Sequence, residues 1–278
     1  MSAARPAAKP FVAACVQTTS GRDIAANVAR ASALVRDAAK AGADFILLPE
    51  TVNIMEPKKD LLRQKVAESK DGGLGAFRAL AADVGRWLLA GSLVVAGGKQ
   101  GKLANRSFLI DPKGKVKARY DKIHMFDVDL GSGESYRESR TYAPGKKAVA
   151  ARLPWGRLGM TVCYDMRFPH LYRALAHRGA DFLSVPSAFT RPTGQAHWHV
   201  LLRARAIETG CFVLAPAQTG GHEGGRKTFG HSLIVDPWGE VLADAGEDEG
   251  FVAARIDPAR VIEARRQIPS LRHDRRFK

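Results

Sequence analysis

Cysteine is scarce in this sequence, and the cysteines that occur follow no pairing or metal-binding pattern. Three are scattered over 278 residues, and there is no Cys-x-x-Cys and no His-Glu-x-x-His. The scarcity excludes a disulfide framework and favours a reducing compartment, so we expect a cytoplasmic protein. Because the ligand motifs are missing, we also predict no catalytic metal and no other cofactor.

Long apolar runs are absent as well. No stretch approaches the ~20 residues that a membrane helix needs. Residues 1–10 are rich in Ala and Pro and lack the apolar core of a secretory signal. We therefore expect no membrane association and interpret residues 1–10 as a flexible lead-in. With 45% hydrophobic residues, the remaining chain is long and apolar enough to bury a large core.

Acidic residues are outnumbered by basic ones. The sequence has 43 Lys and Arg against 28 Asp and Glu, which gives a formal net charge of +15. Such a charge is typical of proteins that bind nucleic acid or acidic membranes. The basic residues are spread along the chain, however, and no basic run is interleaved with aromatics. We predict no specific nucleic-acid partner and interpret the charge as a basic surface that favours an anionic substrate.

One cysteine stands where a strand is expected to turn sharply into a helix. Apolar and β-branched residues lead up to Cys163, and Pro169 stands where a helix can begin. Such a turn exposes a side chain beside free backbone N–H groups that an oxyanion can use. Cys163 is therefore either a nucleophile or a buried core thiol. Cys15 and Cys211, each beside an apolar run, are interpreted as core residues.

The two halves of the chain resemble each other. Residues 42–49 are echoed by 179–186, and residues 107–116 by 232–241, in the same order. Two echoes in one order indicate two similar α/β units. Because each unit has strands too apolar to face water, we expect two sheets packed face to face with helices outside. The predicted fold is a four-layer α-β-β-α sandwich with pseudo-twofold symmetry, in which Glu50 and Cys163 converge at strand ends.

Periodicity places the elements of the first half. We expect strands at 11–17, within 42–50 and at 87–96, helices at 23–40, 61–68 and 74–84, and a hairpin of 107–110 with 115–120. Residues 122–145 form a polar, Gly-rich loop in this interpretation. Residues 220–225 are Gly-rich without the Lys-Ser/Thr of a phosphate loop, and we interpret them as a flexible connection.

Three further residues are candidates for chemistry, and each has an ordinary alternative. Glu50 ends an apolar strand, where burial would raise its pKa and suit it as a general base; alternatively it is a solvated strand-end residue. Lys122 suits an oxyanion but can equally be a surface lysine. Arg137 directly precedes Glu138, and Arg140 follows it two residues later. Glu138 can therefore be an exposed ion-pair residue.

From residue 11 to 277 the chain resembles the nitrilase, or carbon–nitrogen hydrolase, superfamily. The anchors of the resemblance are Leu47-Leu48-Pro49-Glu50, Tyr120-Asp121-Lys122-Ile123-His124 and the Cys163 stretch that ends at Phe168-Pro169. The resemblance implies the four-layer sandwich and a Glu-Lys-Cys triad. Glu50 would take the thiol proton, Cys163 would attack the amide carbonyl, and a thioester would form and be hydrolysed.

The remaining site assignments also rest on the resemblance. Lys122 and the backbone N–H of Tyr164 would hold the oxyanion, and Glu138 would be a second carboxylate near the lysine and the substrate. The chain is expected to form one hydrolase domain over residues 11–265. It would assemble as a homodimer or larger homo-oligomer, with the tail, residues 266–278, at the subunit interface.

Several segments resemble one branch, the deaminated-glutathione amidases. They are Ala188-Phe189, residues 196–209, Phe229-Gly230-His231-Ser232, residues 235–239 and the tail from 268 to 276. Enzymes of that branch cleave the 2-oxo analogue of glutathione to 2-oxoglutarate and cysteinylglycine. Alternatives are an ω-amidase acting on 2-oxoglutaramate, another amidase or nitrile hydrolase, and a catalytically idle binding protein. Residues 130–137 depart from the form expected in either amidase, so the substrate stays open.

A small 2-oxo-acid amide would be anionic and would need a cationic or N–H-rich pocket. Arg167, just after the nucleophile, and Arg191 are candidates for its charge. Either can equally be a surface ion-pair residue. Phe126 and Phe189 are candidates for the pocket wall, with a core role as the alternative.

Overall fold

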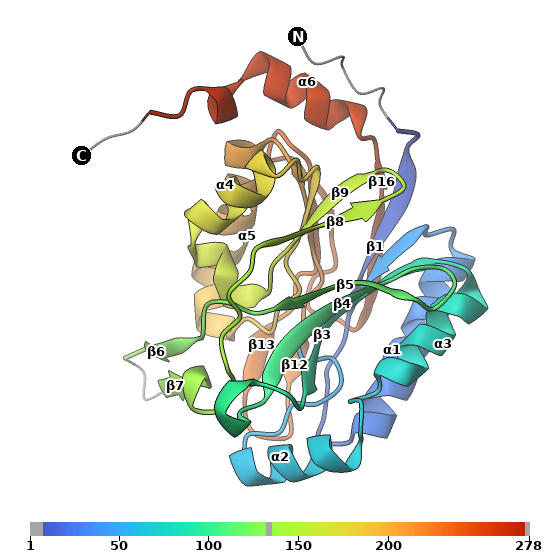
Figure 1. Ribbon diagram of the computed structural model, residues 1–278, viewed down its shortest axis with the longest axis vertical. Coiled ribbons are helices and arrows are strands. Elements are labelled where there is room, and N and C mark those ends of the chain that lie inside the picture. The colour runs from blue at the N-terminus through green and yellow to red at the C-terminus, as the bar shows by residue number, and fades with distance from the viewer. Residues whose placement is uncertain (1–7, 132–134, 276–278) are drawn as a thin grey trace.

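The computed structural model describes residues 8–131 and 135–275, and its centre is a pair of six-stranded β-sheets (Figure 1). The first sheet has the strand order β16 (Gly250–Ile256), β1 (Phe11–Gln17), β2 (Phe45–Leu47), β3 (Trp87–Val95), β4 (Ala104–Ile110), β5 (Val116–Asp121). The second has the order β15 (Val241–Asp244), β14 (Leu233–Val235), β11 (Phe212–Ala215), β10 (Phe182–Ser184), β9 (Gly156–Met160), β8 (Val149–Leu153).

Four helices cover the outer faces of the sheets: α1 (Ile24–Lys40), α3 (Leu74–Val84), α4 (Pro169–His177) and α5 (Arg191–Thr209). In Figure 1, α2 (Lys59–Glu68) lies below the sheets and α6 (Ala259–Gln267) lies above them. Figure 1 shows α1 and α3 on one side of the sheets and α4 and α5 on the other. The helix predicted at 74–84 is confirmed at both ends, and the one predicted at 23–40 begins one residue later, after the cap Asp23.

Side-chain alternation in β1 explains the layers. Ala13 and Cys15 belong to the core between the two sheets, whereas Ala14 and Val16 belong to the core under α1 and α3. A strand that is apolar on both faces must be covered on both, so a strand such as β1 can only lie in an inner layer. The predicted α-β-β-α sandwich is confirmed, and Cys15 is a fully buried core thiol, as is Cys211.

The internal repeat is visible in the strand order. From β8 to β15 the second sheet repeats the order and the strand directions of the first sheet from β16 to β5. Even the hairpin turns agree. Asp111 accepts the N–H groups of residues 113 and 115, each at 2.9 Å. Asp236 accepts those of residues 238 and 240, at 3.0 and 2.8 Å.

Two segments are more ordered than the sequence predicted. The loop expected at 122–145 contains a small hairpin of β6 (Asp127–Asp129) and β7 (Ser135–Arg137). The prediction that residues 220–225 form a flexible connection is wrong, because β12 (Thr219–Gly221) and β13 (Lys227–Phe229) pair there as a second hairpin. Glycine spacing signals a turn, but tertiary contacts decide whether the flanking residues pair.

Parts of the predicted segments lie outside the described residues. These parts are residues 1–7 of the lead-in, 132–134 of the divergent loop and 276–278 of the tail. Among the described residues, no helix is both long and apolar enough to cross a membrane.

Candidate active site

Cys163 lies at the strand-to-helix turn that the sequence predicted. β9 ends at Met160, a short 3-10 turn begins at Cys163, and α4 begins at Pro169. Cys163 itself has φ of +47°, a left-handed conformation that a non-glycine residue rarely adopts. Its N–H donates to the Pro186 carbonyl at 2.9 Å, which ties the turn to the end of β10. Strained backbone of this kind concentrates at functional sites.

A buried carboxylate holds the turn in shape. Asp165 is fully buried and accepts the Val162 N–H at 2.9 Å and the Tyr120 hydroxyl at 2.7 Å. Its other oxygen accepts the His124 N–H at 3.0 Å and lies 2.7 Å from His124 Nδ1. Asp165 thus links the turn at Cys163 to the segment after β5 that carries Lys122. The sequence reasoning missed this role, although an Asp in so apolar a stretch was a signal that it needed partners.

Lys122 lies between two carboxylates, those of Glu50 and Glu138. Its Nζ is 2.9 Å from Glu50 Oε1 and 2.8 Å from Glu138 Oε2. Glu50 and Lys122 are almost completely buried, and Glu138 is partly buried. Asn105, which the sequence reasoning also missed, donates from Nδ2 to Glu50 at 2.9 Å and to Glu138 at 3.3 Å. Glu50 is therefore not the solvated strand-end residue of the alternative reading.

The charges in this cluster set one another's pKa. Burial alone would raise the pKa of Glu50, but the adjacent Lys122 charge and its hydrogen bond outweigh burial, so the pKa of Glu50 lies below its ordinary value. The sequence prediction of a raised pKa was wrong because it did not place the lysine. Burial would lower the pKa of Lys122, but Glu138 and Glu50 hold it well above its ordinary value. The lysine is therefore cationic and Glu50 anionic in the free protein.

The thiol completes the cluster. Cys163 is 6% exposed and lines the same pocket as Glu50 and Lys122. Burial and the negative charge of Glu50 raise the pKa of Cys163, so the thiol is protonated at neutral pH. The other oxygen of Glu50 accepts the Ala188 N–H at 2.9 Å. The geometry gives a neutral thiol, an adjacent ionised base and a fixed cation, which are the components of nucleophilic acyl transfer.

These groups lie at the base of a pocket of about 980 Å³. Four of the predicted substrate contacts line it: Phe126, Tyr164, Phe189 and Arg191. Rings form one wall, with the centroids of Phe126 and Tyr164 5.1 Å apart. A cavity with aromatic walls and a few convergent polar groups is typical of small-molecule sites.

The two predicted arginines are placed differently. Arg191 lines the pocket, but its guanidinium pairs with Glu247 at 2.8 Å, and both side chains are exposed. Arg167 is not among the pocket-lining residues. Its guanidinium lies 5.3 Å from the Phe189 ring centroid and 3.2 Å from His197 Nδ1. Arg167 thus packs behind the wall in this structure.

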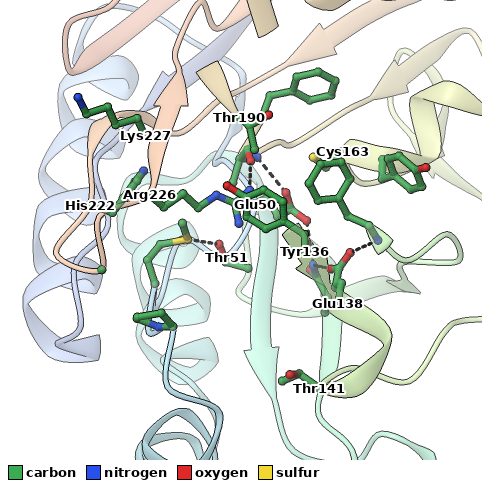
Figure 2. Close-up of a pocket in the computed structure, with 18 of the residues that line it drawn as sticks. Glu50, Thr51, Tyr136, Glu138, Thr141, Cys163, Thr190, His222, Arg226 and Lys227 are labelled. Atoms are coloured by element: carbon green, nitrogen blue, oxygen red, sulfur yellow. Dashed lines mark hydrogen bonds between the residues drawn. The ribbon is translucent and has the colours of Figure 1, made fainter. Parts of the chain in front are cut away.

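A third arginine, which the sequence reasoning did not single out, enters the pocket from the β12–β13 hairpin. Arg226 lines the cavity, donates to the Ala188 carbonyl and lies 5.3 Å from the centre of the Tyr136 ring. Figure 2 shows it extending toward Glu50 from the side opposite Cys163. Its Nε atom is buried without a hydrogen-bond partner among the described residues. The sequence interpretation missed Arg226 because it treated residues 220–225 as a mere connection.

Comparison with known proteins agrees with this geometry. The family model described as carbon-nitrogen hydrolase matches residues 12–266. The chain is 43% identical over 268 residues to a deaminated glutathione amidase of Synechocystis sp., which covers 95% of this chain and 98% of that protein.

Solved structures share the fold. The NitFhit protein of C. elegans superposes with a TM-score of 0.91 at 35% identity, over 97% of this chain and 66% of that one. A mutant amidase from Nesterenkonia sp. AN1 gives a TM-score of 0.78 at 26% identity, over 95% of this chain and 96% of that one. That structure has the acetamide moiety of fluoroacetamide covalently added at its active-site cysteine. The chain therefore belongs to the carbon–nitrogen hydrolase family of the nitrilase superfamily, whose members hydrolyse carbon–nitrogen bonds other than peptide bonds.

Proposed function

We propose that this enzyme is a thiol amidase that hydrolyses deaminated glutathione, a small anionic 2-oxo-acid amide, to 2-oxoglutarate and cysteinylglycine. The observation that carries the proposal is that the Cys163 thiol lines one pocket with Glu50, which is bonded to Lys122, and that the charge of Glu50 acts on the pKa of the thiol. The name of the Synechocystis relative supplies the substrate.

Acylation begins with a proton transfer. Because the pKa of Cys163 is raised and that of Glu50 is lowered, the proton does not leave the thiol before substrate arrives. Glu50 instead takes the proton while Cys163 Sγ forms its bond to the amide carbon. The developing oxyanion is held by Lys122 and by the N–H of Tyr164, at the start of a 3-10 turn where backbone donors lack partners within the turn.

Breakdown of the intermediate returns the proton. Glu50 delivers it to the leaving nitrogen, the carbon–nitrogen bond breaks, and the acyl group stays on Cys163 as a thioester. Water then attacks the thioester with Glu50 again as the base, and the acid and the thiol are regenerated. Glu138 keeps Lys122 cationic and positioned throughout, because it accepts from Nζ with both carboxylate oxygens.

The charge of the substrate follows from the distribution of cations in the pocket. Lys122 is matched by two carboxylates, Arg137 by Asp129 and Arg191 by Glu247. Three other lining cations, Lys59, Arg226 and Lys227, form no ion pair with a carboxylate among the described residues. Lys59 and Lys227 are exposed, whereas Arg226 is partly buried and its Nε atom has no hydrogen-bond partner among those residues. We therefore assign Arg226 to the carboxylate of the 2-oxo acid, since a guanidinium binds a carboxylate through two hydrogen bonds.

A panel of amides tests the function. Deaminated glutathione, 2-oxoglutaramate and glutamine are incubated with wild type and Cys163→Ala, and 2-oxoglutarate, cysteinylglycine and ammonia are measured. Cysteinylglycine release that is well above the 2-oxoglutaramate rate and is lost in Cys163→Ala supports the proposal. A preference for 2-oxoglutaramate would make the protein an ω-amidase. Folded protein that is inactive on every member of the panel contradicts the amidase assignment and favours a binding protein of the same fold.

Arg226→Gln tests the anionic substrate. Losing a charge-assisted bond worth about 1.5–3 kcal/mol should raise KM for deaminated glutathione ~10–100-fold. Arg191→Gln, which removes an exposed pocket arginine already paired with Glu247, is the matched control and should change KM by less than ~3-fold. Equal effects of the two substitutions would remove Arg226 from this role.

We also propose that the protein is a homodimer built on α5, α6 and the tail. Large apolar side chains are exposed on these segments and on the turn between β14 and β15, which carries Trp238; the others are Val200, Ile207, Ile262 and Ile268. A groove between them is lined by Ile207, Gly210, Pro237, Trp238, Ala264 and Ile268. A patch of this kind favours a protein interface. Ile207→Glu with Trp238→Glu should convert a dimer to a monomer in sedimentation experiments, and an unchanged sedimentation coefficient would contradict the placement.

A further inference from the structure

Three side chains converge on the far side of the pocket wall. His199 comes from α5, His231 from the connection between β13 and β14, and Asp244 from the end of β15. His199 Nε2 lies 3.0 Å from Asp244 Oδ2, and His231 Nδ1 lies 2.9 Å from Asp244 Oδ1. The ligand atoms of all three lie within 4.8 Å of one another. None of the three lines the catalytic pocket.

The spacing is close to that of a metal site. Imidazole nitrogens and carboxylate oxygens bind Zn²⁺ at about 2.0–2.2 Å, so ligand atoms around a tetrahedral ion are about 3.3 Å apart. The two nitrogen–oxygen distances here are 3.0 and 2.9 Å. Each imidazole is now hydrogen-bonded to the Asp244 carboxylate. If the imidazoles and the carboxylate moved apart by a few tenths of an ångström, a metal ion could take the place of the protons in these hydrogen bonds.

A second observation that favours a metal site is that other residues hold the proposed ligands His231 and Asp244 in place. His231 has φ of +55°, its N–H donates to the Gly246 carbonyl at 2.6 Å, and its carbonyl accepts Trp198 Nε1 at 2.8 Å. Its ring stacks on Phe229 with centroids 4.4 Å apart. Asp244 accepts the Gly246 N–H at 2.9 Å. Such supporting bonds orient metal ligands and limit the entropy lost on binding.

The site is also open and suitably charged. Side-chain exposures are 35% for His199, 23% for His231 and 32% for Asp244, which leaves room for water ligands. Within residues 8–131 and 135–275, no lysine or arginine is ion-paired with Asp244.

We propose that His199, His231 and Asp244 bind one divalent transition-metal ion of the Zn²⁺ type, with water in the remaining positions. Two imidazoles and one carboxylate select such ions over Mg²⁺ and Ca²⁺, which prefer oxygen ligands. The ion is structural rather than catalytic, because the site lies outside the pocket. It joins α5 to the edge of the second sheet beside Trp198, which packs on the pocket residue Phe189 at 5.2 Å.

The test is calorimetric titration of the full-length, untagged protein with Zn²⁺, and separately with Mg²⁺. All variants carry Cys163→Ala so that the catalytic thiol does not bind the ion. We expect about one Zn²⁺ per chain and no measurable Mg²⁺ binding. Asp244→Asn and His199→Gln should each weaken Zn²⁺ binding by at least ~10-fold, since even supporting residues of metal sites are worth that much.

His177→Gln is the matched control, because His177 also pairs with an aspartate, Asp274, at 2.7 Å, but in the company of Arg173 rather than a second imidazole. It should leave Zn²⁺ affinity unchanged. Circular dichroism shows whether each variant is folded. The proposal is overturned if the parent binds no Zn²⁺, if it binds Mg²⁺ equally well, or if folded Asp244→Asn and His199→Gln both retain full affinity.

Discussion

The two halves of this molecule share one scaffold but differ at equivalent strand ends. β2 and β10 occupy the same place in the repeat, and each is followed by a proline. In the first half the next residue is Glu50, which binds Lys122, Asn105 and the Ala188 N–H. In the second half it is Ser187, whose hydroxyl only donates to the Val185 carbonyl at 3.0 Å. The repeat has kept the backbone and varied the chemistry.

The groups of the proposed active site come from both halves. The first half and its extension supply Glu50, Lys122 and Glu138, whereas the second supplies Cys163 and the Ala188 N–H that binds Glu50. The comparison teaches that the duplicated sheet is a support, and that the site exists because two unlike strand ends meet.

The largest effect is expected when one cysteine in each half is replaced by alanine and the two variants are compared. Cys163→Ala should lower amide hydrolysis by about 10⁴-fold or more, because the nucleophile is lost. Cys15 lies on β1, the strand equivalent to β9, but is fully buried in the core. Cys15→Ala should cost about 1 kcal/mol of folding free energy and leave kcat/KM within ~3-fold. Steady-state kinetics distinguish the two variants, and comparable losses of kcat/KM would contradict Cys163 as the nucleophile.

A second test compares the strand ends. Glu50→Gln keeps the shape of the side chain but removes the base, so kcat should fall ~10²–10⁴-fold. Ser187→Ala loses one hydrogen bond worth about 1 kcal/mol and should leave kcat nearly unchanged. Single-turnover measurements of thioester formation would show whether the Glu50 effect falls on acylation. An unaltered acylation rate would remove Glu50 from the first step.

A third test asks whether the two matching hairpin turns contribute equally to the stability of the fold. Asp236 is fully buried and also pairs with Arg260, whereas Asp111 lies in an exposed turn with no such partner among the described residues. Asp236→Ala should therefore lower the free energy of unfolding by about 2–4 kcal/mol, against about 1 kcal/mol for Asp111→Ala. Urea unfolding measures both, and equal losses would show that burial does not distinguish the two turns.

The smallest expected effect concerns a histidine that joins the halves. His222 Nδ1 lies 2.9 Å from the Ser20 carbonyl and Nε2 lies 2.8 Å from Thr228 Oγ1. Burial lowers the pKa of His222, so below about pH 6.5 the unfolded chain takes up a proton that the folded protein refuses. Stability should therefore decline as the pH falls.

Between pH 7.5 and 5.5, wild type should lose about 1 kcal/mol more unfolding free energy than His222→Gln. Urea unfolding at the two pH values measures this difference, and the remaining titrating groups largely cancel in it. An identical loss in the two proteins would contradict a lowered pKa for His222.

The sequence was a good guide wherever local pattern decides structure. Alternation and repeat placed the sheets, and the Cys163 turn was visible from the change in polarity. It failed where distant residues meet. Asn105, Asp165 and Arg226 act through partners remote in the chain, and the pKa direction of Glu50 depends on a lysine 72 residues away. Local periodicity carries no information about such contacts.

One strand gives the chain an order of assembly. β16 pairs with β1 from Phe11 opposite Ile256 to Gln17 opposite Gly250, and these are the last and first strands of the described residues. During synthesis, β1 therefore remains an unpaired sheet edge until residues 250–256 have left the ribosome. An exposed apolar edge can pair with other chains, so nascent protein should depend on chaperones until its C-terminal strand closes the first sheet.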